Sequence, residues 1–165
     1  MIAPTNFYLN AVKGRPSAEV FNAMLHIYSL LQMEMERYFG PYDLTPVKFN
    51  ALLLIKYLGG KEGLSQTEIS HHMIVSPSNI TRLIDRLIAD GYAERTVSVR
   101  DRRVKVIKLT KSGSQIVDKV LSGYGDMIQD SVYLLERSEV EQLSNLLLKW
   151  FNRLDETKRG LKSGV

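Results

Sequence analysis

The stretch that decides the fold covers residues 65–113 and reads SQTEISHHMIVSPSNITRLIDRLIADGYAERTVSVRDRRVKVIKLTKSG. Its first half carries two helix starts close together. Ser65 stands three residues before Glu68, the spacing of a capping box, and Ser76 stands directly before Pro77. Two helices separated by so short a turn are typical of a helix-turn-helix. We expect helices over 65–73 and 76–90, with the turn at 74–76.

The second of these helices is expected to be amphipathic. At 100° per residue, one face is apolar and the opposite face is polar. Its first turns carry small polar side chains around one arginine, which suits entry into a major groove about 12 Å wide. An amphipathic surface helix without a nucleic-acid partner is the alternative. The apolar face holds Ile80, Leu83, Ile84, Leu87 and Ile88, and the polar face holds Ser78, Thr81, Arg82, Asp85 and Arg86.

A hairpin is expected directly after the second helix. Residues 96–99 and 103–106 alternate polar and apolar side chains and are rich in valine, as in half-buried strands, and Ile107 and Leu109 continue the second run on the other phase. The charged residues 100–102 separate the two runs, so a loop longer than a two-residue turn is expected. A basic hairpin that follows a helix-turn-helix is a wing. The fold class is therefore mainly α with a small β-hairpin wing, a winged helix-turn-helix.

The positive charge of the chain is concentrated in the same region. The chain has 165 residues, a net charge of +4 and a pI near 9.3. Residues 76–115 contain nine Lys or Arg and four acidic residues, a net charge of +5, whereas the rest of the chain carries −1. A polyanionic partner would explain this concentration, and a solvated surface is the alternative.

Other features narrow the class of protein. With 44% hydrophobic and 24% charged residues, the composition is that of a globular domain. There is no cysteine, which excludes disulfides and thiol redox sensing, and no apolar run is long enough to span a bilayer. No motif frames a catalytic site, so an enzyme is not expected, and neither is a cofactor or a bound metal. The expected location is the cytoplasm.

Further helices are expected outside this stretch, each from a capping residue and an apolar pattern. Ser17, Thr45 and Thr110 are candidate caps, and Ser138 with Glu141 has the spacing of a second capping box. Residues 1–16 are expected to be an arm and residues 159–165 a frayed tail. The further helices are expected over 17–39, 45–58, 110–134 and 138–157.

Residues 65–113 resemble the MarR family of bacterial winged-helix transcription regulators. The resemblance rests on SPSNITRLIDRL (76–87), DGY (90–92) and DRRVKVIKLTKSG (101–113). It implies a DNA-binding domain over 45–113 and a helical dimerisation domain over 17–44 and 114–165. It also implies a homodimer that represses transcription from a pseudo-palindromic operator, with the second helix in the major groove and the wing in the minor groove.

The resemblance also assigns roles to residues. At the wing tip Arg103 is expected to enter the minor groove, with Asp101 holding its guanidinium in place. Ile74 stands in the turn, where many helix-turn-helix proteins have glycine, so this turn is expected to be built differently. The candidate DNA contacts are Ser76, Ser78, Asn79, Thr81, Arg82 and Arg86 on the helix and Arg100, Asp101, Arg102 and Arg103 on the wing.

The apolar content of the first and last helices supports a dimer independently, because each carries more apolar residues than one face of an exposed helix needs. Two alternatives stay open: a winged-helix module for protein interaction, and a metal-responsive regulator using Glu68, His71 and His72. Release from DNA by a small-molecule effector is implied by the resemblance. The candidate effector-binding residues are Tyr8, Phe21, Met24, Tyr28, Met33 and Tyr38.

Overall fold

The structure is a computed structural model that describes residues 10–73, 76–99 and 101–162. The chain divides into two compact units at Tyr124. The fold is mainly helical, with a small antiparallel sheet, as expected for a winged helix-turn-helix. Among the described residues, no helix combines the length and the apolar content that a membrane span requires.

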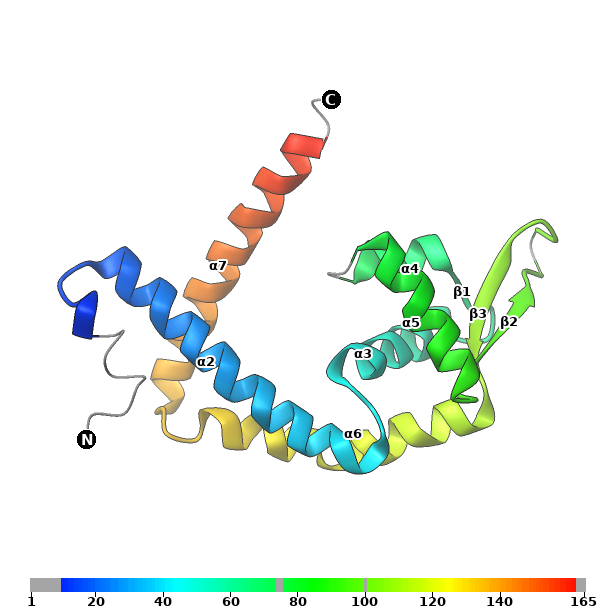
Figure 1. The fold of residues 1–165 in the computed structure, drawn as a ribbon, viewed down its shortest axis with the longest axis horizontal. Helices are drawn as coiled ribbons and strands as arrows, with labels where there is room; N and C mark the ends of the chain where they lie inside the picture. Colours follow the sequence, from blue (N-terminus) through cyan, green and yellow to red (C-terminus); the bar gives the residue numbers. More distant parts are fainter. Residues whose placement is uncertain (1–9, 74–75, 100, 163–165) are drawn as a thin grey trace. The chain divides into compact units, whose positions relative to one another are not determined.

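The long helix of the first unit ends in a tight corner (Figure 1). Helix α2 spans Pro16–Phe39, and the 3₁₀ turn η1 (Gly40–Tyr42) leads into α3 (Pro46–Leu54). Ser17 is not the cap of α2, because Arg15 occupies the N-cap position without a side-chain cap. Thr45 does cap α3, where its hydroxyl accepts a hydrogen bond from the Lys48 amide at 3.3 Å. The expected helix 45–58 is interrupted, since its last turn is the π-helical η2 (Ile55–Gly59).

The helix-turn-helix follows as predicted. Helix α4 spans Gln66–His72, and its capping box is confirmed: the Ser65 hydroxyl accepts from the Glu68 amide, and the Glu68 carboxylate accepts from the Ser65 amide. Helix α5, the recognition helix, spans Pro77–Ala89. Residues 74–75 of the turn lie outside the described residues, and with them the expectation about Ile74.

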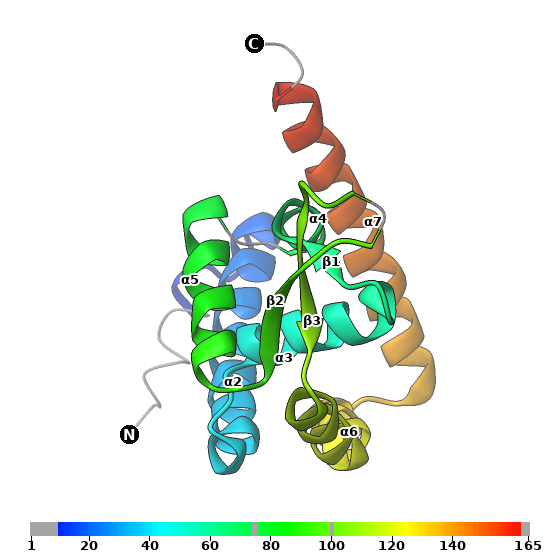
Figure 2. The same cartoon turned by 90° about the vertical axis from the view of Figure 1, so that its right-hand side faces the viewer.

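A three-stranded antiparallel sheet completes the winged helix, in the order β1–β3–β2. Its strands are β1 (Leu64–Ser65), β2 (Ala93–Val97) and β3 (Lys105–Leu109), and Figure 2 shows β2 and β3 running side by side toward the wing tip. The expected first strand, 96–99, is therefore wrong by about three residues. Ala93 pairs with Leu109 at the buried end, whereas Val97 and Val99 are 54% and 80% exposed. Burial, not the local alternation, decides where the strand begins.

Nearly every element of the first unit contributes buried side chains to the hydrophobic core. It takes the last residue of α2, the buried faces of α3, α4 and α5, strand β3 and the first turns of α6 (Lys111–Val132). The side chains that are at most 1% exposed include Phe39, Phe49, Leu52, Ile55, Ile69, Ile80, Ile84, Leu87, Ile107, Val117 and Val120. This packing holds α5 with its polar face outward.

Helix α6 starts in close contact with the end of α5. The Thr110 hydroxyl accepts from the Gly113 amide and donates to the Gly91 carbonyl, so Thr110 is a cap as predicted. The Thr110 amide donates to the Tyr92 carbonyl at 3.1 Å. A Cβ at Gly113 would lie 1.9 Å from the same carbonyl oxygen, so only glycine fits this position.

The second unit contains the end of α6 and helix α7 (Arg137–Lys162). The expected capping box at Ser138 and Glu141 is wrong. Instead the Glu136 amide donates to the Glu139 carboxylate at 2.8 Å, and Glu141 forms an ion pair with Arg137 at 3.1 Å. The helix also continues to Lys162, so the expected frayed tail is wrong for residues 159–162.

Candidate nucleic-acid interface

The recognition helix presents a continuous polar face. Its apolar side chains Ile80, Ile84 and Leu87 are fully buried, which fixes the rotation of the helix on the core. All six candidate contact residues on this helix are exposed: Ser76, Ser78, Asn79, Thr81, Arg82 and Arg86. The sequence-based assignment of the two faces is thus confirmed, whereas contact with DNA stays a prediction.

The start of α5 is held differently from the prediction. Ser76 occupies the N-cap position but makes no side-chain cap, and its hydroxyl lies 3.2 Å from that of Ser78. Instead the helix start is tied to α4, because Gln66 donates to the Thr81 hydroxyl at 2.7 Å. Sequence reasoning missed Gln66, since its partner lies on another helix and no motif signals the pair. This bond orients Thr81 on the exposed face.

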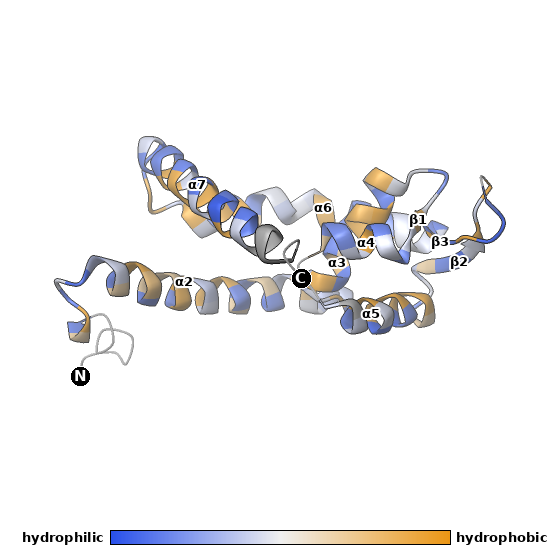
Figure 3. Ribbon diagram, turned by 90° about the horizontal axis from the view of Figure 1, so that it is seen from above, coloured by the Kyte–Doolittle hydropathy of each residue, from blue (hydrophilic) through white to orange (hydrophobic). Residues whose placement is uncertain are grey.

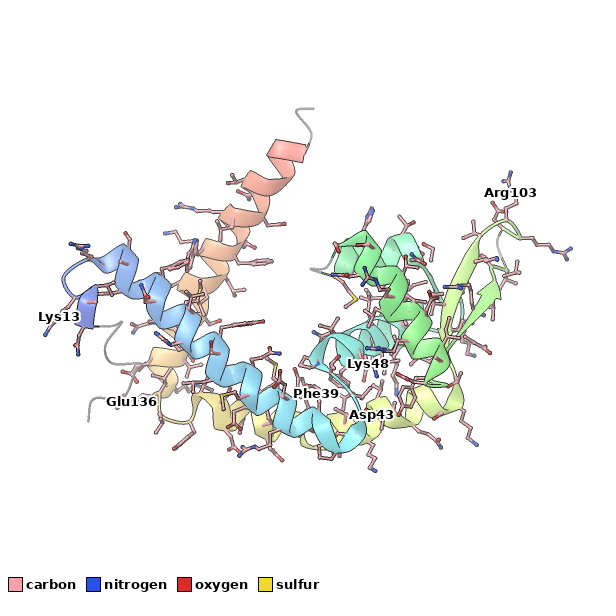
Figure 4. The ribbon with its side chains drawn as sticks, in the orientation of Figure 1. Lys13, Phe39, Asp43, Lys48, Arg103 and Glu136 are labelled. Atoms are coloured by element: carbon pink, nitrogen blue, oxygen red, sulfur yellow. The ribbon has the colours of Figure 1, made fainter. Side chains whose placement is uncertain are left out.

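The wing tip carries an arginine held by a neighbouring carboxylate. Asp101 accepts from the Arg103 amide at 2.9 Å and from its guanidinium at 3.2 and 3.1 Å. These bonds hold the pKa of the Asp101 carboxyl below its ordinary value. The Arg103 side chain is 91% exposed and lies at the tip of the hairpin (Figure 4). The predicted pairing of these two residues is therefore present, and Arg102 is exposed beside them. Arg100 lies outside the described residues.

Asp85 is the one acidic residue among those assigned to the polar face of α5, and an arginine of the wing neutralises its charge. Arg95 on β2 places a guanidinium nitrogen 2.9 Å from the Asp85 carboxylate. This ion pair joins the recognition helix to the wing and offsets a negative charge that would otherwise face a polyanion. No sequence pattern indicates this pair, because the two residues belong to different elements.

The hypothesis of a metal site at Glu68, His71 and His72 finds little support in the structure. Glu68 is engaged in the capping box, His71 and His72 are exposed, and within the described ranges no group of three His, Cys, Asp or Glu side chains is placed to hold a metal ion.

The candidate effector residues are not gathered into one site of the described chain. Tyr38 packs against Phe39 and Tyr124, and its hydroxyl donates to the Val120 carbonyl at 2.5 Å. Phe21 and Tyr28, by contrast, are 53% and 62% exposed along α2. Met24 and Met33 are exposed on the same helix, and Tyr8 lies outside the described residues.

Comparison with known proteins agrees with this geometry. Residues 42–104 match a MarR family model. The HTH-type transcriptional repressor YetL of Bacillus subtilis is 29% identical over 92% of this chain and 89% of its own length. The multiple antibiotic resistance protein MarR of Salmonella typhimurium is 27% identical, over 82% of this chain and 97% of its own length.

The chain is also similar to a solved structure of a protein bound to DNA. A mutant MarR from E. coli, complexed with operator DNA, superposes with a TM-score of 0.72 at 25% identity, covering 79% of this chain and 91% of that one. The relatives are transcriptional regulators, and the matched region includes the recognition helix and the wing tip as far as Val104. The winged helix-turn-helix over residues 42–104 thus matches the MarR family model, and most of the chain is similar to transcriptional regulators of that kind.

Proposed function

We propose that the chain represses transcription as a homodimer bound to a pseudo-palindromic operator. In each half-site α5 lies in the major groove and Arg103 enters the adjacent minor groove. The observation that carries the proposal is that one compact unit presents two basic surfaces: the polar face of α5 with Arg82 and Arg86, and the wing tip with Arg102 and Arg103. A narrow minor groove concentrates negative potential and attracts an exposed arginine.

The dimer is supported by apolar side chains that the single chain leaves exposed. On α2 the exposed apolar side chains recur along the helix, where Figure 3 shows repeated hydrophobic segments. Full burial of each side chain stabilises association by about 1.5–3 kcal/mol, and several together offset the entropic cost of association of about 4–15 kcal/mol. The exposed apolar side chains are Val20, Phe21, Met24, Leu25, Ile27, Tyr28, Leu30 and Met33 on α2, and Leu143, Leu146, Leu147, Leu148, Trp150, Phe151 and Leu154 on α7.

Three further parts of the proposal rest on the family. A repressor of this kind works in the cytoplasm, where its DNA lies, and it acts by binding and not by catalysis. Release from DNA by a small-molecule effector is supported by the resemblance alone. In a dimer whose second chain covers the exposed Phe21 and Tyr28, the effector-binding site would lie on α2.

The test is selective binding to DNA. Duplexes selected by the protein from a random library are expected to contain an inverted repeat whose half-sites lie about 34–36 Å apart. Fluorescence anisotropy should give an affinity at least about 10³-fold higher for the selected duplex than for a scrambled one, falling steeply between about 50 and 200 mM salt. Equal affinity for the two duplexes would refute the proposal.

A further inference from the structure

Lys48 is a buried cation at the junction between α2 and the winged helix. It lies on α3 and is 9% exposed, although lysine is almost never buried without a partner. We propose that Lys48 is a positioning residue for DNA recognition: it fixes the C-terminal end of α5 to the corner between α2 and α3. The inference rests on the proposed function, because positioning matters here only if α5 reads DNA.

Two acceptors from different elements hold the ammonium group. Lys48 Nζ lies 2.8 Å from Asp90 Oδ2, at the C-cap of α5, and donates to the Asp43 carbonyl oxygen at 3.3 Å. The Lys48 and Asp90 side chains are 11% and 26% exposed, so solvent screens this ion pair less than the ion pairs on the surface. Figure 4 shows Lys48 and Asp43 in this region of the fold.

Both partners occupy positions that a lone helix or turn would not favour. Asp90 places a negative charge at the C-terminal end of α5, where the helix dipole is also negative. Asp43 has a φ of 52°, in the left-handed region that side chains other than glycine rarely adopt. The charge of Lys48 neutralises the Asp90 carboxylate, and its hydrogen bond satisfies the Asp43 carbonyl in the turn.

The corner itself is anchored to α2. Phe39, the last residue of α2, is 1% exposed, and its ring centroid lies 5.0 Å from that of Phe49 on α3. Asp43 follows η1 at the same corner. Helix α3 thus joins the two ends: Phe49 packs against Phe39 of α2, and the adjacent Lys48 pairs with Asp90 at the end of α5.

This link acquires a function in a dimer built on α2. There the separation and rotation of the two recognition helices depend on how α5 is held relative to α2 in each subunit. One base pair added between half-sites moves them apart by about 3.4 Å and rotates them by about 34°. A protein whose α5 is held rigidly therefore discriminates sharply between spacings, and loss of the link weakens that discrimination.

The experiment measures spacing discrimination with the full-length protein. Three duplexes are compared by fluorescence anisotropy: the sequence selected by the wild-type protein, and the same sequence with one base pair inserted or removed between its half-sites. Lys48→Met and Asp90→Asn should each lower affinity for the selected duplex about tenfold, as expected for coupled sites, and reduce the spacing penalty by about threefold or more. Asp90→Asn keeps the side-chain volume and decides the matter if Lys48→Met does not fold.

Lys56→Met is the matched control. Lys56 also forms an ion pair and a hydrogen bond to a carbonyl, with Asp118 at 2.5 Å and with Ser114 at 3.3 Å, but both partners lie on α6 and neither on α5. It should keep the wild-type spacing penalty. An unchanged penalty in folded Asp90→Asn, or an equal reduction in Lys56→Met, would overturn the role of Lys48. A wild-type protein without preference for any duplex would overturn the proposed function, and this inference with it.

Discussion

Replacement of Gly113 by alanine tests the junction between the wing and α6. The new Cβ would lie 1.9 Å from the Tyr92 carbonyl oxygen and 2.8 Å from its carbonyl carbon, both backbone atoms that no rotamer change can move. An ordinary C···O contact is about 3.3–3.6 Å, so the two segments must separate by about 1.4 Å or more. That movement also breaks the hydrogen bond from the Thr110 amide to the same oxygen.

The expected loss of stability follows from these two effects. A lost hydrogen bond costs about 1 kcal/mol, and overpacking costs about 1–3 kcal/mol, so Gly113→Ala should lower the free energy of unfolding by about 2–4 kcal/mol. Gly125 is the matched control on the same helix, because a Cβ there meets nothing within 4 Å. Gly125→Ala should stabilise the protein by up to about 1 kcal/mol, since alanine favours a helix.

Urea unfolding at one fixed protein concentration measures both variants, because a dimer's stability depends on concentration. A Gly113→Ala protein within about 1 kcal/mol of the wild type would show that α6 does not approach Tyr92 this closely.

Four further predictions concern DNA binding and assembly. Arg82→Ala should cost about 1–3 kcal/mol of specific binding by anisotropy if Arg82 contacts a guanine, and unchanged operator affinity would refute this contact. Arg103→Ala should flatten the salt dependence by about one phosphate contact, and Asp101→Ala should also weaken binding although it removes a negative charge; tighter binding by the latter would exclude the orienting role. Truncation before Ser138 should leave a monomer by sedimentation, and a well-folded dimer would contradict the interface assigned to α7. The Asp101 pKa is lowered by Arg103, so its bonds at the wing tip are lost at a lower pH than the one at which an ordinary aspartate takes up a proton. A carboxyl NMR titration should show this, with Arg103→Ala moving the midpoint upward.

Local signals predicted the starts of α3 and α4, because a cap is encoded within a few residues of sequence. The capping box at Ser65 and the cap at Thr45 each form as their spacing indicates. The polar face of α5 was predictable for the same reason, because a period of 3.6 residues determines which side chains the core can bury. The Asp101–Arg103 pair needs only two residues of separation and a turn.

Non-local contacts explain what the sequence did not indicate. Strand β2 begins at Ala93 because its pairing with Leu109 is buried, and β1 has two residues and no pattern of its own. At the start of α7 two spacings compete, and the Glu139 carboxylate accepts from the Glu136 amide two residues before the predicted box of Ser138 and Glu141. Gln66 and Lys48 each find their side-chain partner on another helix, so tertiary packing alone reveals them.

A hydroxyl-radical footprint on the selected duplex tests the central claim most directly. With α5 in two successive major grooves and Arg103 in the flanking minor grooves, we expect two symmetric protected regions about 34–36 Å apart, each with an outer segment in the minor groove. Arg103→Ala should remove the outer protection and leave the inner regions in place. A single protected region, or protection spread evenly along the duplex, would contradict a dimer that reads two half-sites with helix and wing.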